Sequence, residues 1–204
     1  MKQSFFKYEK LNLLNNNFFN LDKNQANSNF DKDFKIKKYS NNNHPFIKII
    51  NSQDVFSSSF YNNIYIKIKK TLDKNFFEKL NFEAVWLHKT TKEIYNSKEL
   101  PYIPHIDKIR KFKVMIYLND VNLDCGPLHV LNKDIDTEIF EKKRLQYKDN
   151  FDNLVNNYIL DDYLPCVGNF GTSIFFDTNV PHFGGKLSDN KIRKILRYNF
   201  AIKK

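Results

Sequence analysis

Three side chains in two distant stretches of the chain are of the types that bind transition metals. His105 and Asp107 are separated by a single residue, Ile106, and His182 follows Pro181 much later in the chain. Two imidazoles and one carboxylate form a facial triad, which holds Fe(II) and leaves the opposite face of a six-coordinate ion open. Zinc more often takes four tetrahedral ligands. These residues therefore predict an iron site with room for an organic acid, oxygen and a substrate.

The spacing of these residues also indicates how they are held. In a β-strand, residues i and i+2 point to the same face, so His105 and Asp107 can face one ion while Ile106 packs the other way. Arg193 lies eleven positions after His182, and its planar guanidinium suits bidentate pairing with a carboxylate. Arg197 shares the face of Arg193 on the same expected strand. We expect Arg193, or Arg197 in its place, to hold an acid beside the metal.

The elements that must position these residues are mostly short strands. Apolar runs rich in strand-forming residues predict strands at 46–50, 82–88, 112–118, 128–131, 172–176 and 193–200. Between 54 and 82 apolar residues recur at spacings of three and four, which predicts one or two helices. Gly and Pro, as at Gly126 and Pro127, separate the strands. Several short strands with loops between them favour a sandwich or barrel.

We expect a single domain over residues 1–204, because the chain is long enough for one core and too short for two. Residues 1–81 form a polar, aromatic and helical region that packs on the core with partial order. Residues 82–202 form the catalytic core. The segment near 136–160 is charged and lacks Gly and Pro, which predicts a helical insert. The 20 Phe and 11 Tyr predict a core built from rings.

The composition excludes several classes of function. The net charge is +10, but the lysines are spread along the whole chain, whereas a nucleic-acid binder concentrates them on one face. No apolar run is long enough to span a bilayer, and the first residues show no secretion signal. Cys125 and Cys166 are far apart and are read as unpaired thiols. We expect a cytoplasmic protein without specific nucleic-acid or membrane partners, of unknown oligomeric state.

A family resemblance rests on these residues and the motifs around them. The chain resembles the Fe(II)/2-oxoglutarate-dependent dioxygenases, and most closely the phytanoyl-CoA hydroxylase-type branch, over roughly residues 82–202. The resemblance is carried by His105 with Asp107, by the Gly-Pro-Leu segment at 125–131, by residues 171–177 leading to His182, and by residues 193–200.

The resemblance implies a mainly β protein with flanking helices, a double-stranded β-helix or jelly roll of the cupin-like kind, with the metal inside one mouth. It implies that His105, Asp107 and His182 bind iron and that Arg193 holds the distal carboxylate of 2-oxoglutarate. Decarboxylation of this cosubstrate by O2 to succinate and CO2 would drive hydroxylation of a small or medium-sized metabolite. Because related halogenases lack the carboxylate ligand, Asp107 favours hydroxylation.

Other residues have alternative interpretations. Lys113 and Tyr117 share a strand face and are weaker candidates for cosubstrate binding. His44, His88 and His129 are interpreted as structural or solvent-facing, and Trp86 as core, although Trp86 and His88 share a face that could line a substrate pocket. The basic surface mildly favours an anionic substrate.

Two other functions stay open at this point. One is a jelly-roll binding protein without turnover, and the other is a jelly-roll isomerase or hydrolase that uses the metal without 2-oxoglutarate. An intact triad argues against the first. A carboxylate-binding arginine argues against the second, because it has no role without the cosubstrate.

Overall fold

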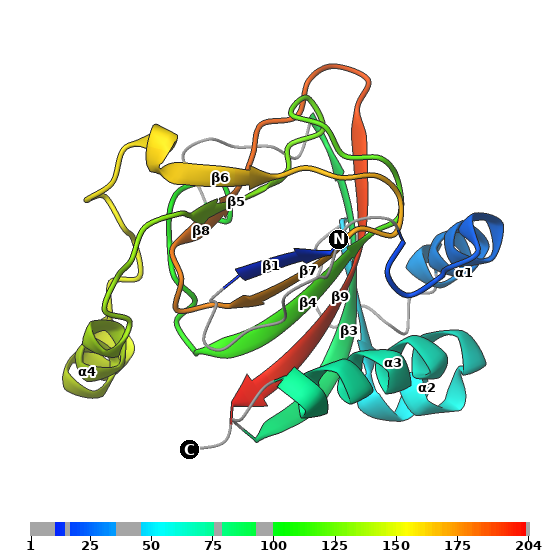
Figure 1. The fold of residues 1–204 in the computed structure, drawn as a ribbon, viewed down its shortest axis with the longest axis horizontal. Helices are drawn as coiled ribbons and strands as arrows, with labels where there is room; N and C mark the ends of the chain where they lie inside the picture. Colours follow the sequence, from blue (N-terminus) through cyan, green and yellow to red (C-terminus); the bar gives the residue numbers. More distant parts are fainter. Residues whose placement is uncertain (1–10, 15–16, 36–45, 76–78, 93–99, 203–204) are drawn as a thin grey trace.

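Two antiparallel sheets face each other (Figure 1). The computed structural model describes residues 11–14, 17–35, 46–75, 79–92 and 100–202. Within these ranges the larger sheet has the strand order β1-β7-β4-β9-β3-β2 and the smaller sheet has the order β6-β5-β8. The larger sheet comprises β1 (Leu11–Leu14), β7 (Ser173–Asp177), β4 (Lys111–Tyr117), β9 (Ile192–Ile202), β3 (Leu80–Thr91) and β2 (Ile47–Asn51). The smaller sheet comprises β6 (Tyr163–Cys166), β5 (Leu128–Leu131) and β8 (His182–Gly184).

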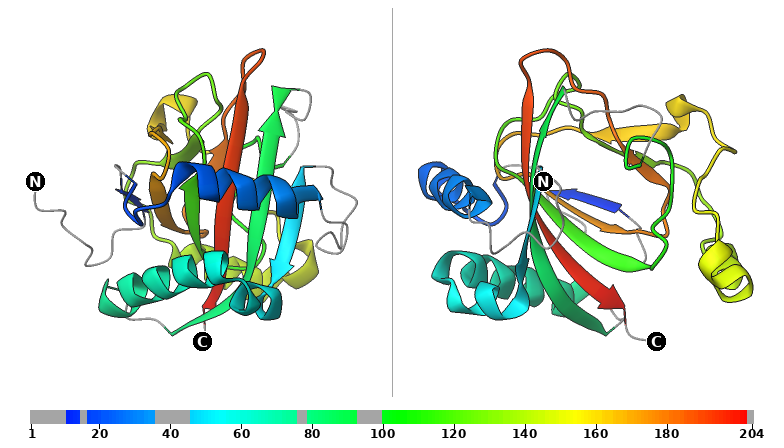
Figure 2. Two further views of the ribbon diagram at one scale, coloured as in Figure 1. Left: turned by 90° about the vertical axis from the view of Figure 1, so that its right-hand side faces the viewer. Right: turned by 180° about the vertical axis from the view of Figure 1, so that it is seen from behind.

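The larger sheet separates two hydrophobic cores, because successive side chains of a strand point to opposite faces. In β4, Val114 and Ile116 belong to the outer core, whereas Met115 and Tyr117 point into the space between the sheets. The helices α1 (Lys23–Lys35), α2 (Ser52–Ser57) and α3 (Ser59–Asn75) supply the other side of the outer core. Figure 2 shows α1 and α3 crossing the outer face of the sheet. The inner core is closed by the smaller sheet.

Aromatic rings fill much of the outer core, as the composition predicted. Phe30 of α1 is fully buried and stacks on Phe34, with ring centroids 5.4 Å apart. Phe19 packs near Phe175 of β7 at 6.2 Å. In addition, β1 pairs with β7 and β2 pairs with β3, so residues from the N-terminal region extend the larger sheet at both edges.

The expected strands are present with small shifts of their ends, and the predicted helical region contains α2 and α3. The N-terminal strand β1 was not predicted from the sequence, and neither was β6. Strand β6 is only four residues long and contains Pro165, a residue that sheets tolerate mainly on edge strands. The position of β6 at the edge of the smaller sheet explains how the proline is accommodated.

The helical insert near 136–160 was predicted too long. The α-helix α4 spans only Glu138–Tyr147, and short 3-10 turns follow at Lys148–Asn150 and Leu160–Asp162. Between these turns the chain is extended, and Leu154 forms an antiparallel bridge with His105. Phe151 and Val155 pack with Ile106 in a small separate core. Tertiary pairing with the segment around His105 therefore replaces helix in the second half of the insert.

The two facing antiparallel sheets, with α1, α2 and α3 against the outer face of the larger sheet and α4 apart from them, confirm the predicted mainly β fold with flanking helices. Among the described residues, no helix is both long and apolar enough to span a membrane.

Candidate metal centre

The structure brings His105, Asp107 and His182 together. One ligand atom from each of these side chains lies within 4.8 Å of the other two. Asp107 Oδ1 is 4.0 Å from His105 Nε2 and 3.5 Å from His182 Nε2. Both histidines are buried, whereas the Asp107 side chain is 20% exposed. The three residues thus form a compact donor set with one side open to solvent.

Backbone pairing holds the two histidines side by side. His105 N–H donates to the His182 carbonyl at 3.1 Å, and His182 N–H donates to the His105 carbonyl at 2.8 Å. This reciprocal pair makes them direct cross-strand neighbours, and their ring centroids lie 4.5 Å apart. Asp107 N–H donates to the Thr178 carbonyl at 3.2 Å. The strand expected at 105–107 is wrong in extent, because it is reduced to an isolated bridge at His105.

Hydrogen bonds to the ring nitrogens prepare both imidazoles for metal binding. His105 Nδ1 lies 2.8 Å from the Ile103 carbonyl, and His182 Nδ1 lies 2.8 Å from the Val180 carbonyl. A carbonyl only accepts, so each Nδ1 carries a proton and each Nε2 is the ring nitrogen left to face a metal. Burial, with a further contribution from the His182 ring, lowers the pKa of His105 to about 3. His105 is therefore neutral at pH 7, the form that binds metal.

A buried lysine sets the state of the carboxylate. Lys113 Nζ of β4 lies 2.5 Å from Asp107 Oδ2, which leaves Oδ1 facing the two histidines. Burial alone would raise the pKa of Asp107, but the Lys113 ammonium and the His182 ring outweigh it and hold this pKa below its usual range. Burial also lowers the pKa of Lys113 to about 8 against the opposing effect of Asp107. At pH 7 the two groups form an ion pair.

The sequence did not reveal this ion pair. Lys113 was predicted to be a weak candidate for cosubstrate binding, but its ammonium contacts Asp107. Tyr117, the other weak candidate, donates its hydroxyl to the Cys166 carbonyl at 2.7 Å and accepts from Leu128 N–H at 3.3 Å. The alternation of side chains along β4 could have predicted that Lys113 and Tyr117 share the inner face. It could not have predicted their contact partners, which lie on other segments of the chain.

Both candidate arginines point into the space between the sheets, on the same face of β9 as the inner-core residue Ile195. Arg193 is buried, and its guanidinium lies against β8 near His182. A Cβ atom added at Gly184 of β8 would be only 3.5 Å from Arg193 Nη2. Arg197 is partly exposed and lies over the Trp86 ring, with 4.2 Å from Cζ to the ring centroid. Burial lowers the pKa of Arg197 to about 10, so it stays charged at pH 7.

Three buried nitrogens on this inner face have no hydrogen-bond partner among the described residues: Arg193 Nε, Arg197 Nε and His88 Nε2. Buried polar atoms are paired in the great majority of cases, so a cluster of exceptions indicates a ligand site. His88 was interpreted from the sequence as structural or solvent-facing. The face it shares with Trp86 was the only local indication that it could line a pocket.

The insert reaches the metal centre through Arg144 of α4. Its Nη2 donates to the Asp107 carbonyl at 2.5 Å and its Nε donates to the Lys108 carbonyl at 3.0 Å. Its Nη1 pairs with Glu141 at 2.5 Å and also contacts Asn179 Oδ1. Arg144 therefore ties the insert to both segments that carry the metal ligands, and it was not a candidate from the sequence.

The remaining sequence candidates lie away from the triad. His129 stacks on Phe183 with ring centroids 4.6 Å apart, and its Nδ1 lies 3.1 Å from the Pro127 carbonyl, which fits a structural role. His44 lies outside the described residues. Cys125 and Cys166 are free, as predicted, and both are buried.

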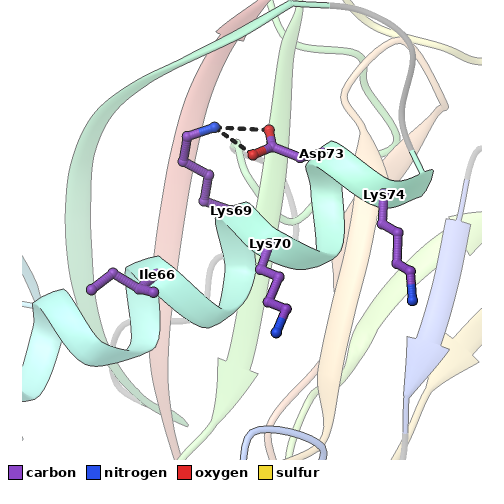
Figure 3. Close-up of a pocket in the computed structure, with 5 residues that line it drawn as sticks. All are labelled: Ile66, Lys69, Lys70, Asp73 and Lys74. Atoms are coloured by element: carbon purple, nitrogen blue, oxygen red, sulfur yellow. Dashed lines mark hydrogen bonds and ion pairs between the residues drawn. The ribbon is translucent and has the colours of Figure 1, made fainter.

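A hollow on the protein surface lies on the outer side of α3 (Figure 3). It is lined by Ile66, Lys69, Lys70, Asp73 and Lys74. Lys69 and Asp73 form an exposed ion pair of 2.6 Å one helical turn apart. Such exposed pairs are common on helices and contribute little stability. The hollow shares no residue with the metal centre.

Known proteins resemble this chain in their structures rather than in their sequences. No protein-family model and no curated protein sequence matches the chain. Solved structures do match. EvdO2 from Micromonospora carbonacea var. aurantiaca, complexed with 2-oxoglutarate, is 13% identical with a TM-score of 0.59 over 95% of this chain and 86% of its own.

Two further structures show the same likeness. The non-heme, alpha-ketoglutarate-dependent epimerase SnoN from nogalamycin biosynthesis, in complex with Fe3+, alpha-ketoglutarate and nogalamycin RO, is 11% identical with a TM-score of 0.64, covering 95% of this chain and 79% of that chain. The viral collagen prolyl hydroxylase of Paramecium Bursaria Chlorella virus-1 is 14% identical with a TM-score of 0.52, covering 100% and 99%. At such low identity the likeness shows the fold, and this chain has the double-stranded β-helix of these 2-oxoglutarate-dependent enzymes.

Proposed function

We propose that this protein is an Fe(II)- and 2-oxoglutarate-dependent oxygenase that hydroxylates a C–H bond of a small or medium-sized metabolite. The observation that carries the proposal is the triad of His105, Asp107 and His182 in a double-stranded β-helix. The triad faces a space with two arginines whose buried Nε atoms have no hydrogen-bond partner among the described residues. A triad with an open face suits iron that must also bind a cosubstrate and oxygen.

The donor set fits Fe(II). Both histidines offer Nε2 as the ligand atom, because their Nδ1 atoms are hydrogen-bonded to backbone carbonyls. Asp107 offers Oδ1, while Lys113 holds Oδ2. We assign the three residues as the iron ligands. We assign Lys113 as the positioning residue that keeps Asp107 ionised and, by holding Oδ2, leaves Oδ1 as a monodentate ligand. When bound, iron and 2-oxoglutarate supply the oxidising power, with succinate and CO2 as products of the cosubstrate.

Arg193 is assigned to the distal carboxylate of 2-oxoglutarate, with Arg197 as the alternative. Arg193 is buried, carries a free Nε and lies against β8 beside Gly184, two residues beyond His182. A bidentate arginine–carboxylate pair would fix the position and orientation of the cosubstrate relative to the iron. Apolar inner-core side chains such as Ile174 and Phe176 exclude water from the same space.

Several finer assignments belong to the same proposal. The Gly-Pro-Leu segment supports the phytanoyl-CoA hydroxylase-type branch: Gly126 has φ +62°, and a Cβ there would lie 2.5 Å from the Gly185 carbonyl oxygen. We further propose one domain over residues 1–204 with an N-terminal region at 1–81 and a catalytic core at 82–202. A cytoplasmic location and an anionic substrate complete the proposal, supported by the unpaired thiols and by the net charge of +10.

Succinate formation tests the proposed function. Anaerobically purified protein is mixed with Fe(II), ascorbate and 2-oxoglutarate, and succinate is measured after air is admitted. We expect slow turnover without a substrate, which Asp107→Ala abolishes and which Asp134→Ala, at an exposed site, leaves unchanged. An absence of both succinate formation and 2-oxoglutarate binding in the wild-type protein would contradict the proposal.

A further inference from the structure

Trp86, His88 and Arg197 form a polar and aromatic row on the inner face of β3 and β9. Trp86 pairs with Arg197 across the two strands, and His88 pairs with Ile195. The Arg197 guanidinium lies over the Trp86 ring at 4.2 Å, and the Trp86 and His88 rings are nearly parallel at 5.9 Å. The stacking presents the guanidinium edge and the His88 ring in one surface.

This row is more open than the site assigned to the cosubstrate. Trp86, His88 and Arg197 are each partly exposed, whereas Arg193 is only 6% exposed. Arg197 also pairs across the strands with Met115 of β4, two residues from Lys113, whose ammonium contacts the candidate ligand Asp107. A molecule that enters from solvent can therefore reach Arg197 beside the metal, while Arg193 lies in a more enclosed position.

Two polar atoms of the row have no hydrogen-bond partner among the described residues. They are Arg197 Nε and His88 Nε2, and both are buried. Leaving such atoms unpaired costs free energy, which a bound ligand recovers by supplying the missing hydrogen bonds. Burial and the neighbouring Arg197 lower the pKa of His88 well below its usual value, so His88 is neutral. The row thus offers hydrogen-bond donors and one full positive charge.

The charges between the sheets exceed what the cosubstrate requires. Lys113 is paired with Asp107, but neither Arg193 nor Arg197 has a carboxylate partner among the described residues. Fe(II) and the 2-oxoglutarate dianion carry equal and opposite charges, so their binding leaves this excess unchanged. One distal carboxylate occupies one arginine. The other arginine remains available for a second anion.

We propose that Arg197, together with Trp86 and His88, binds an anionic group, a carboxylate or a phosphate, of the substrate to be hydroxylated. The proposal rests on the proposed function and assigns a substrate class to the same site. A bidentate contact to the Arg197 fork fixes the anion, and the Trp86 ring beneath the guanidinium holds the fork in place. The substrate carbon to be oxidised then projects from this anchor toward the metal centre.

Trp86 provides the readout, because it is the single tryptophan of the chain. Protein loaded with Zn(II), which does not turn over, is first saturated with 2-oxoglutarate and then titrated with inorganic phosphate or with acetate at constant ionic strength, while tryptophan emission is recorded. We expect a second, saturable change after saturation with 2-oxoglutarate. The anion that binds more tightly distinguishes a phosphate-bearing from a carboxylate-bearing substrate.

Variants assign the two arginines. We expect Arg197→Lys and Arg197→Met to weaken the second anion by about 10-fold or more, the usual effect of losing a charge-assisted hydrogen bond, and to change 2-oxoglutarate affinity by less than about threefold. Arg193→Met should show the reverse pattern. Lys186→Met, which removes an exposed positive charge, serves as the control. Because substitution of Arg197 alters the surroundings of Trp86, the same affinities are also measured by calorimetry.

Two results would overturn the subsite. One is that Arg197→Lys weakens 2-oxoglutarate as strongly as Arg193→Met does, which would give Arg197 to the cosubstrate. The other is that no anion binds once 2-oxoglutarate is saturating. In both cases 2-oxoglutarate still binds and the proposed oxygenase function stands. A protein that binds no 2-oxoglutarate in any form would overturn the subsite and the function together.

Discussion

Arg193→Met is expected to stabilise the metal-loaded protein that lacks 2-oxoglutarate and to remove most of the stabilisation by 2-oxoglutarate. Arg193 is 6% exposed, its Nε has no partner, and no described carboxylate pairs with it. Apolar replacement of buried ionic groups stabilises proteins by about 1–4 kcal/mol. We take about 1–2 kcal/mol, because the Tyr102 and Tyr117 side chains partly compensate the charge.

The same substitution should have the opposite effect on the cosubstrate complex. About 2–4 °C of melting temperature corresponds to each kcal/mol in a domain of this size, so the cosubstrate-free variant should melt about 2–8 °C higher than wild type. A charge-assisted hydrogen bond contributes about 1.5–3 kcal/mol, so 2-oxoglutarate affinity should fall by about 10- to 150-fold. At 100 times the dissociation constant, 2-oxoglutarate should raise the unfolding free energy of the wild type by about 2.7 kcal/mol.

Thermal melts with Zn(II), with and without 2-oxoglutarate, measure both effects on one sample, and calorimetry gives the affinity. Lys186→Met, which removes a solvated charge, should change neither quantity. The reasoning is refuted if Arg193→Met lowers the melting temperature of the cosubstrate-free protein, because the guanidinium would then have a stabilising partner. It is also refuted if 2-oxoglutarate stabilises the variant as much as the wild type.

Three further predictions concern the parts that support the site. Arg144→Ala should weaken Zn(II) binding several-fold and make the insert more sensitive to limited proteolysis, because four charge-assisted contacts are lost, whereas Lys143→Ala at the adjacent exposed position should not. Burial raises the pKa of Cys166 to about 12, so this fully buried thiol should resist alkylation at pH 8 in the folded protein and react only in denaturant; rapid labelling of the native protein would contradict this. Phe30→Ala should lower the unfolding free energy by about 3–5 kcal/mol in urea titrations, and a loss below 1 kcal/mol would mean that α1 does not belong to the cooperative fold.

The strands could be predicted from the sequence because their signal is local. The run at 112–118 is apolar and rich in strand-forming residues, and β4 spans Lys111–Tyr117. The insert was harder, because the absence of Gly and Pro argued for a long helix. Its second half instead pairs with the metal segment through Leu154 and His105, and nothing in the local sequence indicates a partner some fifty residues away.

The donor types and their order were also readable. Two histidines and an aspartate in the order found here predict a facial triad, and the structure brings their ligand atoms together. The sequence could not predict which face of β9 points into the space between the sheets, because both faces of Ile192–Ile202 mix apolar and basic residues. Helices α1 to α3 cover the face that carries Leu196 and Tyr198, and this coverage turns Arg193 and Arg197 inward.

The sequence by itself thus determined the fold class, the metal-binding residue types and the presence of arginines after His182, because each depends on residue chemistry or short-range periodicity. Only the tertiary structure decided that Lys113 pairs with Asp107, that His88 Nε2 has no hydrogen-bond partner among the described residues, and that neither inward-facing arginine pairs with a described carboxylate. These features depend on which faces of distant strands meet when the two sheets close. That choice is made by packing of the whole core and leaves no trace in local spacing.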